Sequence, residues 1–269
     1  RNMGIINSLN NHALKQGFEE NGYITLKNAF DVGHINNILS ETQSIFMIQA
    51  QRKGIDTRDL SSAIRNLFVN HRKVFKNCGK QAQHLVDAWK LACDEKLMNV
   101  LINVCGLKFP NICTRPVTMF NSISLSSNEG YHTLSAHQDS ISMRGSSNAV
   151  VVWLPLAEIS QELGPLQIVP SSHLKGNLAD DIDEFGFGII PDSMFKDEEF
   201  ISLEGMGPGD AVIFNSHLVH RSGKLWTDSG IRWTLQFRYN DLLDEMFIEE
   251  DFVNPYIYRP MTDKELNNE

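Results

Sequence analysis

This chain has fewer basic than acidic residues, and it has no long apolar run. Its 269 residues include 24 Lys and Arg against 33 Asp and Glu, which gives a net charge of −9. Nucleic acids and anionic membranes are bound mainly through basic surfaces, so neither is an expected partner. No apolar run reaches about 18 residues, the length of a transmembrane helix candidate, so we expect no membrane span.

Cysteine is also scarce, and its placement argues against two common uses. The chain has four cysteines, none in a Cys-X-X-Cys spacing and all in its first half: Cys78, Cys93, Cys105 and Cys113. This pattern disfavours both a disulfide framework and a zinc site, and it fits reduced thiols. Since no secretory signal is visible, we expect a cytoplasmic protein.

The length and the 42% hydrophobic content suit one domain with a sizeable core. We predict a single domain over residues 1–269, with a helical part over about 1–112, a strand-rich core over about 113–241 and a C-terminal extension over 242–269. In the first part, Ser8 to Glu20 predicts a helix and Tyr23 to Leu26 a short strand. A long helix begins at Asp31 or Gly33, and another helical stretch runs from Gln81 to about Val104.

The strongest chemical signal is His137-Gln138-Asp139, followed far downstream by His220. On a strand, side chains two positions apart point to the same face, so His137 and Asp139 can reach one metal ion. The third ligand then comes from elsewhere in the fold, and His220 is the candidate. Two imidazoles and one carboxylate form the ligand set with which non-heme Fe(II) oxygenases hold one face of the metal, leaving the other face open.

The segments around this motif follow a specific order. Arg232 lies twelve positions after His220, and a turn with an apolar strand leads into His220. The ordered set consists of the apolar run 150–156 with Trp153, Gly164-Pro165-Leu166, Pro170-Ser171-Ser172-His173, the strand-like 209–219, Ser222-Gly223 and Arg232. Together with the His-X-Asp motif, this set closely resembles the phytanoyl-CoA dioxygenase-like family of Fe(II)/2-oxoglutarate oxygenases over roughly Met119 to Tyr239.

The resemblance implies a fold and a chemistry. The fold is α+β and mainly β: a double-stranded β-helix, the cupin-like jelly roll, with the N-terminal helices packed on it. The chemistry uses Fe(II), the cosubstrate 2-oxoglutarate and O2. One departure from the family pattern is the loop between His220 and Arg232, which is about one residue longer than usual.

The family pattern also implies roles for individual residues. His137, Asp139 and His220 hold Fe(II), which 2-oxoglutarate chelates through its keto oxygen and near carboxylate. Arg232 binds the far carboxylate, for which a planar guanidinium is suited, and Ser222 adds a hydroxyl hydrogen bond.

Three further residues are implied around the cosubstrate. Trp153 and Met119 form walls of its pocket, and Asn121 contacts the cosubstrate or the substrate. A purely structural place in the core is the alternative for Trp153, because it stands in a valine-rich apolar run.

Other histidines compete with His220 or have simpler explanations. His217 is the main rival, although three positions of separation on a strand place it on the opposite face. His132 likewise faces away from His137, and the family pattern implies a structural role for His173. The remaining histidines fall in helical-looking stretches and are expected to be solvated: His12, His34, His71 and His84.

The substrate is expected to be a small polar metabolite or biosynthetic intermediate. Gln138, Arg144 and Arg238 are the candidate contacts; Arg238 binds either a substrate carboxylate or a structural Asp, and Arg144 either reaches the mouth of the core or is solvated. The polar segment 53–77 either covers that mouth or contacts the substrate. The basic residues of this segment, with Arg52 just before it, form either an anion-binding patch or a solvated helix face. They are Arg52, Lys53, Arg58, Arg65, Arg72 and Lys73.

An acidic insertion spans Asn177 to Glu199. It contains Asp180-Asp181-Ile182-Asp183-Glu184 and then Phe185-Gly186-Phe187-Gly188. Long loops in compact domains are usually functional or disordered, so this segment is either a lid over the active site or a solvated surface loop.

Three classes of function are consistent with these residues. The first is hydroxylation of an unactivated C–H bond with release of succinate and CO2. The second is desaturation, cyclisation or epimerisation at the same iron. The third is a non-catalytic jelly-roll binding protein, against which the complete set of His137, Asp139, His220 and Arg232 argues. Related halogenases lack the carboxylate ligand, so Asp139 also argues against chlorination.

Overall fold

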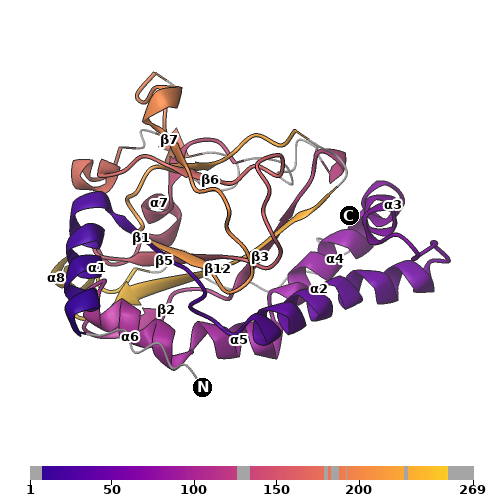
Figure 1. Ribbon diagram of the computed structural model, residues 1–269, viewed down its shortest axis with the longest axis horizontal. Helices are drawn as coiled ribbons and strands as arrows, with labels where there is room; N and C mark the ends of the chain where they lie inside the picture. Colours follow the sequence, from indigo (N-terminus) through magenta and orange to yellow (C-terminus); the bar gives the residue numbers. More distant parts are fainter. Residues whose placement is uncertain are drawn as a thin grey trace.

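The computed structural model describes residues 8–125, 134–178, 181–182, 188–191, 193–226 and 230–253. Figure 1 shows β5 and β12 between helices α2, α5 and α6 on one side and β6 and β7 on the other. Within the described residues, no helix combines the length and the apolar character that crossing a bilayer requires. The helices are α1 (Ser8–Asn21), α2 (Val32–Arg52), α3 (Leu60–Asn70), α4 (Arg72–Ala82), α5 (Val86–Ala92), α6 (Glu95–Asn103), α7 (Asp139–Met143) and α8 (Glu245–Glu249).

The strands form two antiparallel sheets. The main sheet has the order β1 (Tyr23–Leu26), β10 (Ala211–Asn215), β5 (Val150–Pro155), β12 (Arg232–Asp241) and β2 (Pro110–Ile112), and β3 (Val117–Asn121) also pairs with β12. The minor sheet has the order β7 (Asp181–Ile182), β8 (Gly188–Ile189), β4 (His137–Gln138), β11 (His220–Ser222), β6 (Leu166–Ile168) and β9 (Ile201–Ser202).

The two sheets face each other across a shared core. Trp153 and Phe214 of the main sheet belong to the same buried cluster as Leu166 and Ile168 of the minor sheet. Two facing antiparallel sheets of this kind form a jelly roll. The predicted double-stranded β-helix is therefore confirmed.

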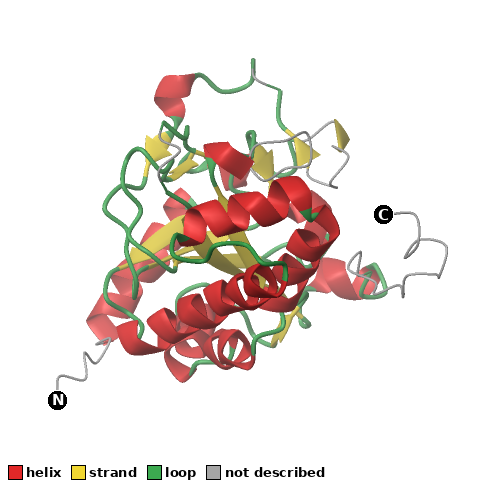
Figure 2. Cartoon of the chain, turned by 90° about the vertical axis from the view of Figure 1, so that its right-hand side faces the viewer, coloured by secondary structure: helices red, strands yellow, loops and turns green. Residues whose placement is uncertain are grey.

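The helices cover the other face of the main sheet. Ile38 and Phe46 of α2 pack in one cluster with Ile213 of β10 and with Leu235 and Phe237 of β12. Figure 2 shows this helical layer lying across the sheet. The valines and isoleucines of β5 and β10 are buried on both faces, which is why these strands are continuous apolar runs.

The predicted helical stretch from Gln81 to Val104 is helical, but it is not one continuous helix. Helix α4 ends at Ala82, α5 ends at Ala92, and α6 begins at Glu95, where Asp94 caps it by accepting hydrogen bonds from the N–H groups of Lys96 and Leu97. Apolar spacing continued across these breaks and concealed them. Within residues 53–77, α3 buries Ile64 and Leu67 in the core, so this segment is not polar throughout.

Strand β12 presents different chemistry on its two faces. Trp233, Leu235, Phe237 and Tyr239 belong to the cluster shared with the helices. The alternate residues Arg232, Thr234, Gln236 and Arg238 line the space between the sheets. All ten residues of the strand are buried, so a line of polar side chains runs through the interior.

The acidic insertion contributes to the minor sheet in its described parts. Strand β8 pairs with β4, with Ile189 opposite His137 and Gly188 opposite Gln138. Ile190 and Phe195 then pack against Val169 and Val219. The reading of 177–199 as a plain loop is therefore corrected, while residues 183–187, on which the lid hypothesis depends, lie outside the described residues.

Asp241 ends β12 and joins it to two neighbouring segments. Its carboxylate accepts hydrogen bonds from the backbone N–H groups of Lys108 at 3.0 Å and Phe109 at 2.9 Å, and from the Asn148 side chain at 3.0 Å. Burial by itself would raise the pKa of this carboxyl, but these hydrogen bonds lower the pKa below its ordinary value of 3.8. A depressed pKa stabilises the fold above the ordinary value, and this contribution is lost as the pH falls through the folded-state pKa.

We expect Asp241→Asn to lower the free energy of unfolding by about 1–3 kcal/mol at neutral pH, because three partly buried donors lose a charged acceptor. The deficit relative to the wild type should shrink below pH 3.8, since protonation then removes the same charge from the wild-type side chain. Urea unfolding from neutral pH to about pH 3 tests both points. A deficit that does not change with pH would contradict the explanation.

Candidate metal centre

His137, Asp139 and His220 form a buried cluster between the sheets, called the metal cluster below. Their ligand atoms all lie within 4.8 Å of one another. His137 and His220 stand opposite each other on the paired strands β4 and β11. Strand β4 ends at Gln138, so Asp139 is the first residue of α7 and not the strand residue that was predicted. The carboxylate nevertheless joins the two imidazoles.

Backbone carbonyls orient both imidazoles. Nδ1 of His137 lies 2.7 Å from the carbonyl oxygen of Ser135, and Nδ1 of His220 lies 2.9 Å from that of Leu218. A carbonyl oxygen only accepts, so each Nδ1 carries the proton and each Nε2 is left with a lone pair. Nε2 is thus the nitrogen that can bind a metal in each ring.

The surroundings of the cluster favour the protonation states that metal binding needs. Burial, followed by the proximity of His137, lowers the pKa of His220 to about 4. Burial alone would raise the pKa of Asp139, but the Arg238 guanidinium and the two imidazoles bring it down to about 2. At neutral pH, His220 is therefore neutral and Asp139 is ionised, which is the form in which each binds a divalent ion.

Arg238 is placed on the carboxylate of the metal cluster. Its Nη2 donates to Oδ1 of Asp139 at 3.0 Å and to Oε1 of Gln236 at 3.1 Å. The two partners considered for Arg238 were a substrate carboxylate and a structural Asp. The structure pairs it with an Asp of the chain, Asp139.

Arg232 is buried in a different setting. Its Nη2 donates to Oδ1 of Asn121 and to Oγ of Ser222, each at 3.0 Å, and its Nη1 donates to the carbonyl oxygen of Gly164. Its Nε has no hydrogen-bond partner, and no carboxylate of the described residues forms an ion pair with it. Burial lowers the pKa of Arg232 to about 10, which leaves it charged at neutral pH. A buried cation without an acidic partner is costly, so an anionic ligand would stabilise it.

One cavity of about 110 Å³ joins the metal cluster to Arg232. His137, His220, Arg232 and Ser222 all line it. The predicted wall residues Met119 and Trp153 border the same cavity, together with the apolar Leu134, Leu166 and Phe214. Asn121 reaches the site indirectly, through its hydrogen bond to Arg232.

Sequence reasoning missed Thr234 and Gln236, which also line this cavity. The signal was present, because polar and apolar residues alternate strictly from Arg232 to Tyr239. With Arg232 facing the site, the two-residue period of a strand brings Thr234 and Gln236 to the same face.

Gln138, a predicted substrate contact, does not line the cavity beside the metal cluster, and its side chain bonds within the protein. Its amide nitrogen donates to the carbonyl oxygens of Gly176 at 2.9 Å and His217 at 2.5 Å. Its amide oxygen accepts from the N–H of Leu178 at 2.8 Å. The side chain is fully buried, and these hydrogen bonds join three segments beside the metal cluster.

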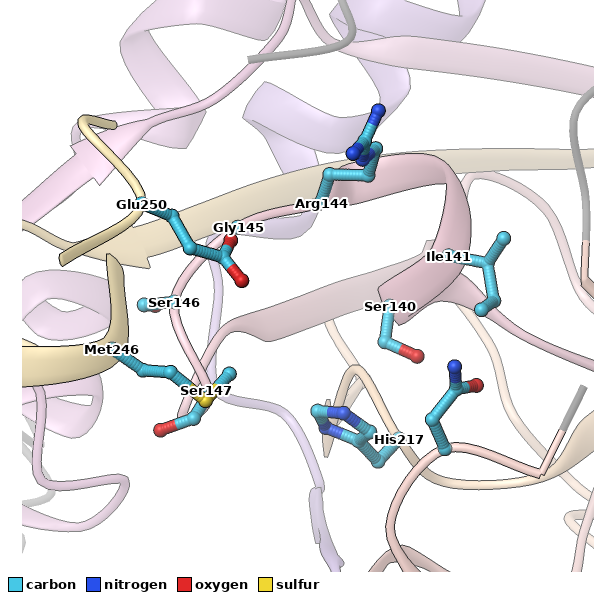
Figure 3. A pocket seen from close by; sticks show the side chains of 10 residues that line it. Ser140, Ile141, Arg144, Gly145, Ser146, Ser147, His217, Met246 and Glu250 are labelled. Carbon is cyan, nitrogen blue, oxygen red and sulfur yellow. The ribbon is translucent and has the colours of Figure 1, made fainter. Parts of the chain in front are cut away.

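Arg144 and His217 border a different cavity, of about 400 Å³, together with Ser140 and Met246. Figure 3 shows His217 and Ser140 facing this cavity, with Arg144 at its edge. None of the three residues of the metal cluster lines it. The structure therefore brings His220, and not its rival His217, to Asp139, and it gives Arg144 no contact with the metal cluster.

The other candidates lie outside the cavity beside the metal cluster. In the proposed basic patch, Arg58 pairs with Asp56, and the guanidinium of Arg72 stacks 3.6 Å from the ring centroid of Phe68. His173 has a structural contact, since its Nε2 lies 3.1 Å from the carbonyl oxygen of Glu19 in α1. His132 lies outside the described residues.

Several known proteins resemble this chain in sequence. The 1-deoxypentalenic acid 11-beta-hydroxylases of Streptomyces exfoliatus and Streptomyces arenae are each 28% identical to it over 92 residues. The matched stretch covers 32% of this chain and 32% of each relative.

Solved structures with low sequence identity share the fold. The epimerase SnoN in complex with Fe3+, alpha ketoglutarate and nogalamycin RO has a TM-score of 0.60 at 15% identity, over 87% of this chain and 85% of its own. The apo form of the non-heme monooxygenase ThoJ has a TM-score of 0.58 at 17% identity, over 85% and 77%. EctD from S. alaskensis with bound Fe has a TM-score of 0.54 at 15% identity, over 97% and 84%.

The family model for phytanoyl-CoA dioxygenase (PhyH) matches residues 18–233, which include the whole metal cluster and Arg232. The chain belongs to the phytanoyl-CoA dioxygenase (PhyH) family.

Proposed function

We propose that this protein is a Fe(II)- and 2-oxoglutarate-dependent oxygenase that hydroxylates an unactivated C–H bond of a small metabolite or biosynthetic intermediate. Succinate and CO2 are the products from the cosubstrate. One observation carries the proposal: a buried two-histidine, one-carboxylate cluster opens on a cavity that also holds a buried arginine without an acidic partner. The first feature suits a metal and the second suits an anion.

The metal cluster fits Fe(II) by the chemistry of its donors. His137 and His220 each offer Nε2, because Nδ1 of each ring is engaged by a backbone carbonyl, and Asp139 offers an ionised oxygen. Two imidazoles and one carboxylate hold one face of the ion and leave the opposite positions open. The hydrogen bonds from Nδ1 to backbone carbonyls fix the orientation of both rings before the metal arrives.

The other part of the cavity fits the far carboxylate of 2-oxoglutarate. Arg232 offers a guanidinium, and Ser222 offers a hydroxyl 3.0 Å from Nη2 of that arginine. A carboxylate placed there would supply the charge partner that the described residues lack, and it could accept from the unpartnered Nε. Asn121 holds the guanidinium from the side by accepting its hydrogen bond.

With Fe(II), 2-oxoglutarate and O2 bound, the site would supply the oxidant that replaces a hydrogen on carbon by a hydroxyl group. The chain has three tasks in this chemistry. The metal cluster and Arg232 would orient the cosubstrate from its two ends. Leu134, Leu166 and Phe214 would exclude water from the cavity, and the walls would keep the target carbon close to the metal.

A second outcome at the same site has specific support. The fold neighbours include an epimerase, SnoN, and a carbocyclase, SnoK, which has a TM-score of 0.55 at 11% identity. Desaturation, cyclisation or epimerisation would use the same ligands, so analysis of the product separates them from hydroxylation. We favour hydroxylation because the two Streptomyces relatives named above are hydroxylases.

We infer that the substrate is a small molecule and that the protein works in the cytoplasm. The cavity beside the metal cluster is small and mostly apolar, and the net charge of −9 disfavours nucleic acid. The cysteines are free, and burial raises the pKa values of the Cys78 thiol to about 11 and the Cys113 thiol to about 12. Free thiols without a disulfide partner are suited to a reducing compartment.

Anaerobic absorption spectroscopy tests the proposal most directly. We expect a weak visible charge-transfer band when Fe(II) and 2-oxoglutarate are both present, and no band with either alone. His220→Ala should abolish the band, while His217→Ala should retain it. A wild-type protein that gives no band and has no affinity for 2-oxoglutarate would refute the proposal and favour a non-catalytic binding protein.

A further inference from the structure

Asp139 divides its two carboxylate oxygens between different partners. Oδ1 accepts a hydrogen bond from Nη2 of Arg238 at 3.0 Å, whereas Oδ2 lies 3.5 Å from Nε2 of His220. The Arg238 and Asp139 side chains are only 6% and 1% exposed, so water screens this ion pair weakly. One oxygen is thus engaged by a cation, and the other faces the metal cluster.

Arg238 is itself held in place from its own strand. Its Nη2 also donates to Oε1 of Gln236 at 3.1 Å, and Nε2 of Gln236 lies 3.2 Å from Sδ of Met119. Gln236 and Arg238 are two positions apart on β12, opposite Trp153 and Val151 of β5. The guanidinium is therefore positioned by the centre of the main sheet and not by a loop.

The number of oxygens that Asp139 gives to a metal decides how many positions stay open. A carboxylate can bind a cation through one oxygen or through both. Three protein ligand atoms hold one face of an octahedral ion and leave the opposite face for a chelating cosubstrate and O2. A second oxygen from Asp139 would take a position that this chemistry needs.

We propose that Arg238 is a positioning residue that holds Oδ1 of Asp139 away from the metal, so that Asp139 coordinates through Oδ2 alone. This inference rests on the proposed function, because it requires a metal at the cluster. Without the cation, Oδ1 loses its partner in a buried site, and the metal is the nearest replacement. The carboxylate then binds through both oxygens and closes one open position.

Mn(II) in place of Fe(II) gives a readout that does not depend on turnover. Water-proton relaxation of the Mn(II)-loaded protein, without cosubstrate, reports how many water molecules the metal holds. We expect Arg238→Gln to hold one water fewer than the wild type. Arg115→Gln is the matched control, because Arg115 is exposed and its Nε bonds only to Gln83 among the contacts described, and it should keep the wild-type number.

An unchanged water number in metal-loaded Arg238→Gln would overturn this inference and leave the proposed function standing. A wild-type protein that fails to bind Mn(II) would overturn both. If Arg238→Gln does not fold, the crystal structure of the wild-type protein with Mn(II) decides the question. It should show one oxygen of Asp139 on the metal and the other on Nη2 of Arg238, and two oxygens on the metal would overturn the inference.

Discussion

Replacing Asp139 with alanine should abolish turnover and destabilise the fold at the same time. Activity should fall by at least about a thousandfold, or about 4 kcal/mol of transition-state stabilisation, because the metal loses its charged ligand. Stability should fall by about 3–5 kcal/mol, because Arg238 is left as a buried cation without its acid. Succinate release measures the first effect, and urea unfolding of the metal-free protein measures the second.

The double variant Asp139→Ala/Arg238→Met separates these two effects. Removing both charges should restore much of the stability, since a buried ion pair replaced by apolar side chains is often close to neutral. Turnover should stay absent, because the ligand is still missing. Normal turnover in the single variant would refute the role of Asp139, and a double variant no more stable than the single one would refute the explanation of the stability loss.

Replacing Arg232 with methionine should raise the concentration of 2-oxoglutarate needed for half-maximal turnover by about a hundredfold, or about 3 kcal/mol. The far carboxylate would lose its charge partner, whereas the metal cluster would keep all its ligands. Mn(II) affinity should therefore stay within about threefold of the wild-type value, a difference of less than 1 kcal/mol. Steady-state kinetics at varied 2-oxoglutarate and a Mn(II) titration are the two measurements.

The stability of Arg232→Met should fall by less than that of Asp139→Ala. The lost hydrogen bonds to Gly164, Asn121 and Ser222 are partly offset by the removal of a buried cation that has no acid within the described residues. Arg115→Met, a change on the surface, is the control and should alter neither the cosubstrate requirement nor the metal affinity. An unchanged requirement for 2-oxoglutarate in Arg232→Met would mean that another group holds the far carboxylate.

Two arginines on one face of β12 thus have opposite roles. Arg238 has its acid within the chain and fixes a metal ligand, while Arg232 has only neutral partners and is suited to an incoming anion. The two arginines are six residues apart on the same strand, and both line the cavity beside the metal cluster. A ligand in that cavity could therefore contact Arg232 while Arg238 stays bound to Asp139. Both arginines are buried to a similar extent, so burial does not distinguish them. The difference between them comes from their hydrogen-bond and charge partners.

The sequence by itself predicted the family, the fold class and the ligand candidates. His137, Asp139, His220 and Arg232 were recognisable because each stands in a local pattern with a fixed order. The helix α1, the strand β1 and the long helix α2 were also predictable, because the glycine stop at Gly22 and the apolar spacing and Asp31 cap of α2 are local properties of the chain.

The tertiary structure alone decided the contacts between segments distant in sequence. Nothing local indicates that Arg238 would meet Asp139, 99 positions away, or that Gln138 would bond to Gly176 and Leu178. The packing of strands and the segments that follow them sets these pairs, and a register shift of β12 by one residue would turn Arg238 to the other face. Local patterns specify which residues can do chemistry, and the pairing of strands determines which partners they have.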